Sequence, residues 1–171
     1  MRLNSILFDL DGTLVDTLPG IEHSCQAALH AVLPNRKLEN LRQRIGPPIR
    51  EIFRQAFPDI EPIVLDQLQT QFRINYDTAG WQKSIAYPGV LETLAQLIDW
   101  KVDCFVVTNK PSSPTEKILR HLGLDKYFKE TTSPDCRAGS FSSKTSAIEY
   151  LVTKHKLPTE HTVVVGDSLD D

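Results

Sequence analysis

The feature that most constrains the fold of this chain is a series of short apolar runs separated by segments with helical periodicity. The apolar runs predict strands over residues 5–9, 103–109 and 162–167, and residues 130–133 are expected to add a short strand. The segments between them predict helices over residues 90–100, 114–122 and 144–155. Strands that alternate with helices of about ten residues are typical of a parallel sheet covered on both faces. We therefore predict an α/β fold with a doubly wound parallel sheet.

A long helical block interrupts this alternation. From residue 17 to residue 85 apolar residues recur at helical intervals, and several prolines and glycines divide the block into separate helices. We interpret residues 17–85 as an inserted helical domain and residues 1–16 with 86–171 as the α/β core. Flexible joints are expected near Asp16-Thr17 and Ala86-Tyr87, so that the insert could close over the core.

Composition and charge exclude several classes of function. The chain carries 22 acidic and 19 basic side chains, a net charge of −3, which argues against a polyanion-binding protein. Aromatic residues do not alternate with the arginines of the stretch 35–55 as a stacking surface for bases would require, so no nucleic-acid partner is expected. No apolar run reaches the roughly 18 to 20 residues that span a membrane. Cys25, Cys104 and Cys136 have no zinc-like spacing, and we expect free thiols in a cytoplasmic protein.

Polar residues follow the predicted strands at the points where the strands end. Asp9 ends the first predicted strand and Asp11 follows it, Thr108 and Asn109 close the second, and Asp167 ends the last. Ligands bind outside the carboxyl ends of the strands in an open parallel sheet, so these side chains should converge. Asp9 and Asp11 are two residues apart, and they leave the same side of an extended chain.

The convergence of acidic residues predicts a metal and a phosphorylated substrate. Asp9, Asp11, Asp167 and Asp171 would repel one another unless a cation neutralised them, and oxygen ligands suit Mg²⁺. Protein-bound Mg²⁺ commonly takes one or two carboxylates together with substrate phosphate oxygens. An aspartate can also attack phosphorus and form an aspartyl-phosphate, while its neighbour transfers protons.

Four segments of the sequence resemble the conserved motifs of a known enzyme family. Asp9-Leu10-Asp11-Gly12-Thr13 is similar to the first motif, D-x-D-G-T, of the phosphatase members of the haloacid dehalogenase-like (HAD) hydrolases. Thr108 matches the second motif, Lys144 the third, and 166–171 the fourth, G-D-x-x-x-D. The resemblance covers the whole chain, with the helical block in the place of the family's helical cap. Two further segments, Arg44–Pro48 and Tyr87–Val90, are similar to the phosphoglycolate phosphatase-like branch.

The resemblance implies a role for each residue near the phosphoryl group. Asp9 would be the nucleophile and Asp11 the general acid and base. Thr108 would hydrogen-bond a phosphoryl oxygen, with Asn109 beside it, and Lys144 would neutralise negative charge on the nucleophile and the phosphoryl group.

The resemblance also implies the metal ligands. Asp9 would bind Mg²⁺ through its second oxygen and Asp11 through its backbone carbonyl. Asp167 would bind the ion directly, and Asp171 would support the ion or its waters.

Together these features predict a Mg²⁺-dependent phosphatase of the HAD superfamily with a small phosphorylated substrate, for which phosphoglycolate is the leading candidate. A sugar phosphomutase of the same superfamily would use the same Asp9 and Asp11. A dehalogenase is disfavoured, because that branch resembles D-x-Y-G-T. A non-catalytic binding or regulatory module with the same fold is the alternative from a different class. No oligomeric state is predicted.

The sequence leaves two roles for Lys110. It could contact an anionic group of the substrate, or it could be a surface lysine.

The sheet of the core is expected to need further cover. The family's core normally continues beyond the fourth motif, and the continuously apolar strand 162–165 requires cover on both faces. Either the chain is part of a longer protein that completes the core, or another chain supplies the missing layer, and we expect the first.

Overall fold

The computed structural model describes residues 3–168 and consists of two compact units. We call them the core unit, Met1–Asp16 with Ile85–Asp171, and the helical unit, Thr17–Ser84.

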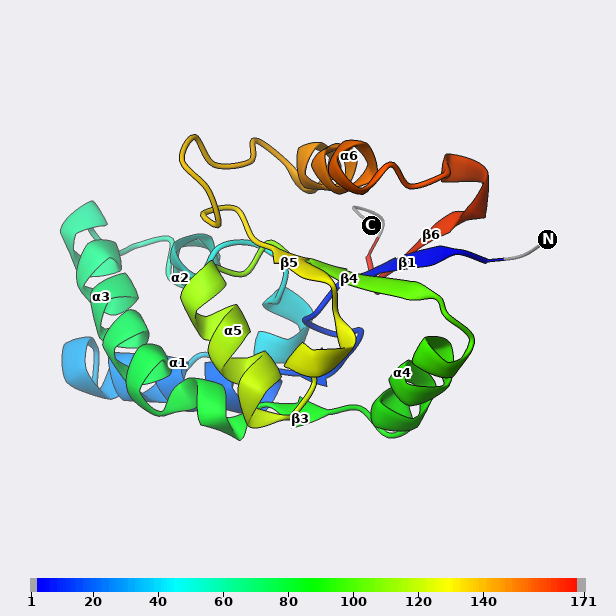
Figure 1. Cartoon of the computed structure of the whole chain (residues 1–171). Coiled ribbons are helices and arrows are strands. Elements are labelled where there is room, and N and C mark those ends of the chain that lie inside the picture. The colour runs from blue at the N-terminus through cyan, green and yellow to red at the C-terminus, as the bar shows by residue number, and fades with distance from the viewer. Residues whose placement is uncertain (1–2, 169–171) are drawn as a thin grey trace. The chain divides into compact units, whose positions relative to one another are not determined.

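The core unit is built on a four-stranded parallel sheet (Figure 1). Its strands are β1 (Ser5–Phe8), β4 (Asp103–Val107), β5 (Glu130–Thr132) and β6 (Thr162–Val165), in the order β5-β4-β1-β6. Each strand lies within a run predicted from the sequence, so the predicted α/β fold with a parallel sheet is confirmed. The two middle strands, β1 and β4, are buried along almost their whole length because both of their faces are covered.

Helices lie on both faces of this sheet (Figure 1). They are α4 (Val90–Asp99), α5 (Ser112–His121) and α6 (Lys144–His155), with short 3-10 turns at Asp125–Tyr127 and Thr159–His161. Ala147 and Leu151 of α6 pack in one cluster with Leu7, Phe105 and Val107 of the sheet. Figure 1 shows α4 and α5 on the opposite face.

The ends of α5 illustrate how local chemistry sets helix limits. The helix begins at Ser112, two residues before the predicted start, because Pro114 lies in the first turn, where a missing backbone N–H costs nothing. At the other end Gly123 has a φ of +66°, the left-handed conformation that glycine adopts most readily, and this confirms the predicted stop.

A second, two-stranded sheet was not predicted from the sequence. β2 (Val15–Asp16) and β3 (Ile85–Ala86) pair antiparallel, with Val15 opposite Ala86 and Asp16 opposite Ile85. Ile85, assigned above to the helical block, therefore belongs to the core unit.

The helical unit contains three helices, α1 (Leu18–Val32), α2 (Ile49–Ala56) and α3 (Pro62–Thr78), and 3-10 turns at Leu41–Arg44 and Gly80–Lys83. Its core includes Cys25, Ala28, Phe53 and Leu68, which are almost completely buried. Among residues 3–168 no helix combines the length and the apolar character that a membrane span requires.

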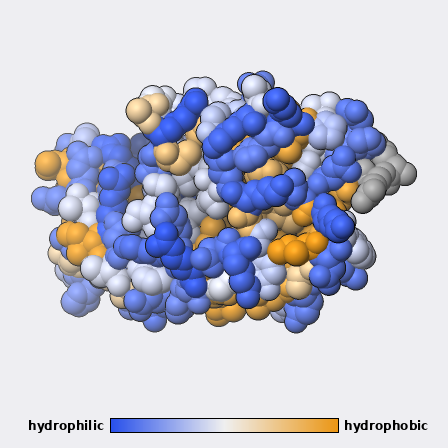
Figure 2. Space-filling model, in the orientation of Figure 1, coloured by the Kyte–Doolittle hydropathy of each residue, from blue (hydrophilic) through white to orange (hydrophobic). Residues whose placement is uncertain are grey.

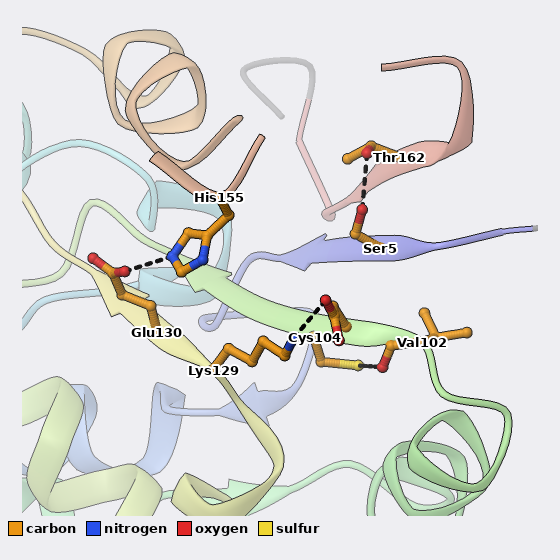
Figure 3. Close-up of polar contacts among 8 residues, drawn as sticks. Ser5, Val102, Cys104, Lys129, Glu130, His155 and Thr162 are labelled. Atoms are coloured by element: carbon orange, nitrogen blue, oxygen red, sulfur yellow. Dashed lines mark hydrogen bonds and ion pairs between the residues drawn. The ribbon is translucent and has the colours of Figure 1, made fainter. Parts of the chain in front are cut away.

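Polar side chains tie neighbouring elements of the core unit together (Figure 3). The hydroxyls of Ser5 and Thr162, which are opposite each other in the β1–β6 register, share a hydrogen bond of 2.9 Å. Lys129 donates to Asp103 at 2.6 Å. β6 lies at the edge of the described sheet, and Val163 is 46 % exposed. On the face drawn in Figure 2, hydrophobic side chains appear in small groups within a mostly hydrophilic surface.

Glu130, the first residue of β5, joins the sheet to α6 and makes stability depend on pH. Its carboxylate lies 2.8 Å from Nε2 of His155 (Figure 3). It also accepts a hydrogen bond from Lys154. Burial raises the pKa of Glu130, but these hydrogen bonds outweigh burial and hold the pKa below its usual range. A lowered folded-state pKa means that the carboxylate stabilises the fold above the unfolded-state pKa of about 4.3, and that this contribution is lost as the pH falls through the folded-state pKa.

We therefore predict that Glu130→Gln lowers the free energy of unfolding at pH 7 by about 0.5 to 1 kcal/mol, a modest loss because the pair is partly exposed. The difference from the parent should shrink as the pH falls below about 4. Urea denaturation at several pH values measures both effects. Glu149→Gln, at an exposed position of α6, is the control and should change neither. An equal loss at pH 3 and pH 7 would contradict the assignment.

Candidate active site

The loop after β1 holds its two aspartates in a tight, hydrogen-bonded turn. The N–H of Asp9 donates to the carbonyl of Val165 at 2.8 Å, so the pairing with β6 continues one residue past the strand. The carbonyl of Leu10 then accepts from the N–H groups of Leu14 and Val15, at 3.0 Å each. Asp9 is buried and Asp11 is partly exposed. The turn therefore buries the carboxylate of Asp9 at the carboxyl end of β1 and leaves the carboxylate of Asp11 accessible to a ligand.

Lys144 pairs with Asp9 across 135 residues of sequence. Its Nζ donates to Oδ1 of Asp9 at 2.6 Å, and both side chains are less than 10 % exposed. Lys144 is the first residue of α6, and that helix end is fixed by a capping box in which Ser143 and Ser146 bond each other's backbone N–H groups. The cap thus holds the lysine at the carboxyl end of β1, where it neutralises a buried carboxylate.

Thr108 follows β4 and is also buried. Its N–H donates to the carbonyl of Thr132 at 3.0 Å, and its Oγ1 accepts from the N–H of Lys110 at 3.1 Å. This bond uses a lone pair of the oxygen and not the hydroxyl proton, so the proton stays available for donation to an acceptor outside the loop. Asn109, predicted beside it, is exposed.

Lys110 also contacts the first loop. Its Nζ donates to Oδ1 of Asp11 at 2.8 Å, and the two side chains are 10 % and 27 % exposed. The sequence did not decide between a substrate contact and a surface position for this lysine, because 99 residues separate it from Asp11 and no pattern links the two positions. Its position two residues after Thr108 was the available signal.

Asp167 lies against Gly12. A Cβ built on Gly12 would stand 2.7 Å from Cγ of Asp167 and still closer to its Oδ2. Gly12 also has a φ of +86°, so both the space and the backbone conformation favour glycine there. The exposed carboxylate of Asp167 is thereby brought next to the turn that carries Asp9 and Asp11. Asp171, the fourth acidic residue predicted, lies outside the described residues.

The donors in this region have the chemistry that Mg²⁺ requires. Across residues 3–168 no group of three or more His, Cys, Asp or Glu side chains is arranged to hold a metal ion. Mg²⁺ needs fewer, since it keeps several waters and often takes only one or two protein carboxylates. The carboxylates of Asp9 and Asp167 and the carbonyl of Asp11 are hard oxygen donors on adjoining loops, so the residues present fit the ion.

The two buried cysteines are poor candidates for a nucleophile. Burial raises the pKa of Cys25 to about 12, helped by the charge of Glu22, and raises that of Cys104 to about 11, helped by Asp103. Both thiols stay protonated at neutral pH, whereas the thiolate is the reactive form. Cys136 is exposed, and all three are free thiols as expected.

Comparison with known proteins shows which family this chain is similar to. Residues 6–171 match the family model described as haloacid dehalogenase-like hydrolase. A 5'-nucleotidase of Pseudomonas aeruginosa is 30 % identical over an alignment of 172 positions, gaps included, that covers 100 % of this chain and 77 % of that protein. A phosphoglycolate phosphatase of Vibrio vulnificus is 32 % identical over an alignment of 181 positions that covers 99 % of this chain and 78 % of that one.

The fold is shared with solved structures as well. A structure from Haemophilus somnus, described as "a predicted phosphoglycolate phosphatase", aligns with a TM-score of 0.85 and 29 % identity. The alignment covers 100 % of this chain and 80 % of that one.

Proposed function

This chain belongs to the haloacid dehalogenase-like hydrolase family and is homologous to phosphatases, and from that premise we propose that it is a Mg²⁺-dependent phosphomonoesterase with Asp9 as nucleophile. The observation that carries the proposal is the buried pair of Asp9 and Lys144 at the carboxyl end of the sheet. A buried carboxylate held by a lysine is oriented for attack, and the lysine also offsets the charge of an incoming phosphate.

The reaction would proceed in two displacements. In the first, an oxygen of Asp9 forms a bond to phosphorus, the bond from phosphorus to the ester oxygen breaks, and Asp11 gives its proton to the departing oxygen. In the second, Asp11 takes a proton from a water whose oxygen bonds to phosphorus, and the bond from phosphorus to Asp9 breaks. Inorganic phosphate and the unchanged carboxylate of Asp9 result.

The remaining residues stabilise the phosphoryl oxygens. Phosphoryl transfer depends mainly on positioning and on neutralising the equatorial oxygens. Thr108 would donate its hydroxyl proton to one of them, with Asn109 beside it, and the ammonium of Lys144 would lie near both Asp9 and the phosphoryl group. Such fixed donors stabilise the transition state without reorganisation.

The metal ligands in this proposal are the carboxylates of Asp9 and Asp167 and the carbonyl of Asp11, with Asp171 in support. When bound there, Mg²⁺ supplies positive charge against the phosphoryl oxygens.

We propose a small phosphorylated metabolite as substrate, with phosphoglycolate as the first to assay. The two relatives named above, a 5'-nucleotidase and a phosphoglycolate phosphatase, act on phosphate monoesters, which supports the reaction class and leaves two substrate classes to compare. A panel of phosphorylated metabolites, assayed for free phosphate, tests the proposal.

The same assay separates the alternatives. Release of free phosphate from simple esters, with rapid-quench detection of phosphate bound to the protein, is the expected result. A sugar phosphomutase would instead return the phosphoryl group to a second hydroxyl. Mg²⁺ binding with neither transfer nor release would indicate a binding module and would contradict the proposal.

The close approach of Gly12 to Asp167 gives a separate prediction. Gly12→Ala should lower the free energy of unfolding by about 1 to 2 kcal/mol, because of its positive φ, and should also raise the Mg²⁺ concentration for half-maximal activity severalfold, because the Cβ displaces Asp167. Gly89→Ala is a matched control: its φ is +84°, and its Cβ would meet nothing within 4 Å. That control should lose similar stability and keep the Mg²⁺ dependence of the parent. The same Mg²⁺ response in both variants would refute a link between Gly12 and the metal site.

A further inference from the structure

We propose that Lys110 is a specificity-determining residue that binds an anionic group on the leaving group of the substrate. The chemical class is a phosphate monoester whose ester oxygen is separated from a carboxylate by about one carbon atom. This inference rests on the proposed function, because it takes Asp11 as the residue that protonates the ester oxygen.

The distance between Lys110 and Asp11 places the ammonium beside the leaving group. Nζ of Lys110 lies 2.8 Å from Oδ1 of Asp11. If Oδ1 of Asp11 itself reaches the ester oxygen through one hydrogen bond, the ammonium is within about 6 Å of that oxygen, two hydrogen-bond lengths at most. A carboxylate carbon one methylene away lies two bonds of about 1.5 Å from the same oxygen. Its oxygens are therefore able to reach Lys110 when the carboxylate is directed toward the ammonium.

Lys110 differs from the surface lysines of the core unit. Its side chain is 10 % exposed, whereas Lys129 and Lys154, which also pair with carboxylates, are 55 % and 47 % exposed. The backbone N–H of Lys110 is bonded to Oγ1 of Thr108, so the residue is anchored at both ends. A charge held in a fixed place at a site loses little side-chain entropy when it binds a ligand.

Access and charge favour a ligand at this point. Asp11 is 27 % exposed, so a substrate can approach the pair from solvent. An ammonium is a compact charge that binds a carboxylate strongly when water is partly excluded. A nucleoside 5'-monophosphate carries a neutral carbon chain next to its ester oxygen, so it would gain nothing from Lys110. Lys110 would therefore favour carboxylate-bearing esters over nucleoside 5'-monophosphates.

The test compares two esters of almost equal size, 2-phosphoglycolate and ethyl phosphate, which differ chiefly in the carboxylate. The full chain should hydrolyse 2-phosphoglycolate with a kcat/KM about 10- to 100-fold above that for ethyl phosphate, the range of one charge-assisted hydrogen bond. Lys110→Met should remove most of this ratio, because it should raise KM for 2-phosphoglycolate much more than KM for ethyl phosphate. Lys129→Met, which also breaks a lysine–aspartate pair, is the control and should retain the ratio.

A binding measurement gives a readout without turnover. In the Asp9→Asn background, calorimetry should show that Lys110→Met weakens binding of 2-phosphoglycolate about 10-fold more than it weakens binding of ethyl phosphate. Equal losses for both esters would overturn the inference, because Lys110 would then act only by positioning Asp11. Equal hydrolysis of both esters by the parent would overturn it while leaving the phosphatase assignment intact. Hydrolysis of neither ester, nor of any ester in the metabolite panel, would overturn both.

Discussion

Replacing Asp9 with asparagine should reduce phosphate release from a generic aryl phosphate by at least about 10³-fold, because an amide cannot form the aspartyl-phosphate. Asparagine has nearly the shape of aspartate, and its carbonyl oxygen can still accept the hydrogen bond that Lys144 now gives to Oδ1. The variant should therefore remain folded. Steady-state kinetics measures the loss, and circular dichroism with thermal unfolding confirms the fold.

The control for this substitution is Asp103→Asn. Asp103 begins β4, at the end of the strand opposite Thr108, and also pairs with a lysine, Lys129, at 2.6 Å. Its replacement removes an ion pair of the same type away from the proposed site, so turnover should stay within about twofold of the parent. Unchanged hydrolysis by the Asp9 variant would overturn the assignment of the nucleophile.

Removal of divalent cations should have a comparable effect. A chelator should bring turnover to background, and added Mg²⁺ should restore it, because phosphoryl oxygens and carboxylates would otherwise meet without a neutralising charge. Asp167→Asn should raise the Mg²⁺ concentration for half-maximal turnover at least 10-fold, since it removes one of the two proposed carboxylate ligands.

Asp125→Asn, at an exposed position in a 3-10 turn of the core unit, is the matched control and should leave the Mg²⁺ response as it is. Activity that persists in chelator would show that the carboxylates serve another purpose.

The order of strands and helices in the core unit could be predicted because its signals are strong and local. A continuous apolar run such as Asp103–Val107 indicates a strand buried on both faces, and Gly123 marks a helix end by its backbone freedom. By contrast, β2 and β3 contain two residues each, and a segment of that length has no periodicity to detect. Their pairing depends on a partner about 70 residues away.

The candidate site shows the same division between local and long-range information. The positions of Asp9 and Thr108 at strand ends follow from the apolar runs before them, because parallel strands end at a common edge. The sequence alone does not show that Lys144 is buried against Asp9 or that Lys110 pairs with Asp11. Both contacts join segments that only the folded sheet brings together. The resemblance singled out Lys144 and was silent on Lys110.

The two-stranded ribbon of Val15–Asp16 and Ile85–Ala86 has a consequence for how such a chain can change its architecture. Asp16 and Ile85 are neighbours across the ribbon, so the chain leaves the core unit and re-enters it at adjacent points. Replacing Thr17–Ser84 with a two-residue turn such as Asn-Gly would join these strands as a β-hairpin. Domains of different size could therefore replace Thr17–Ser84 at this junction without altering the register of the parallel sheet.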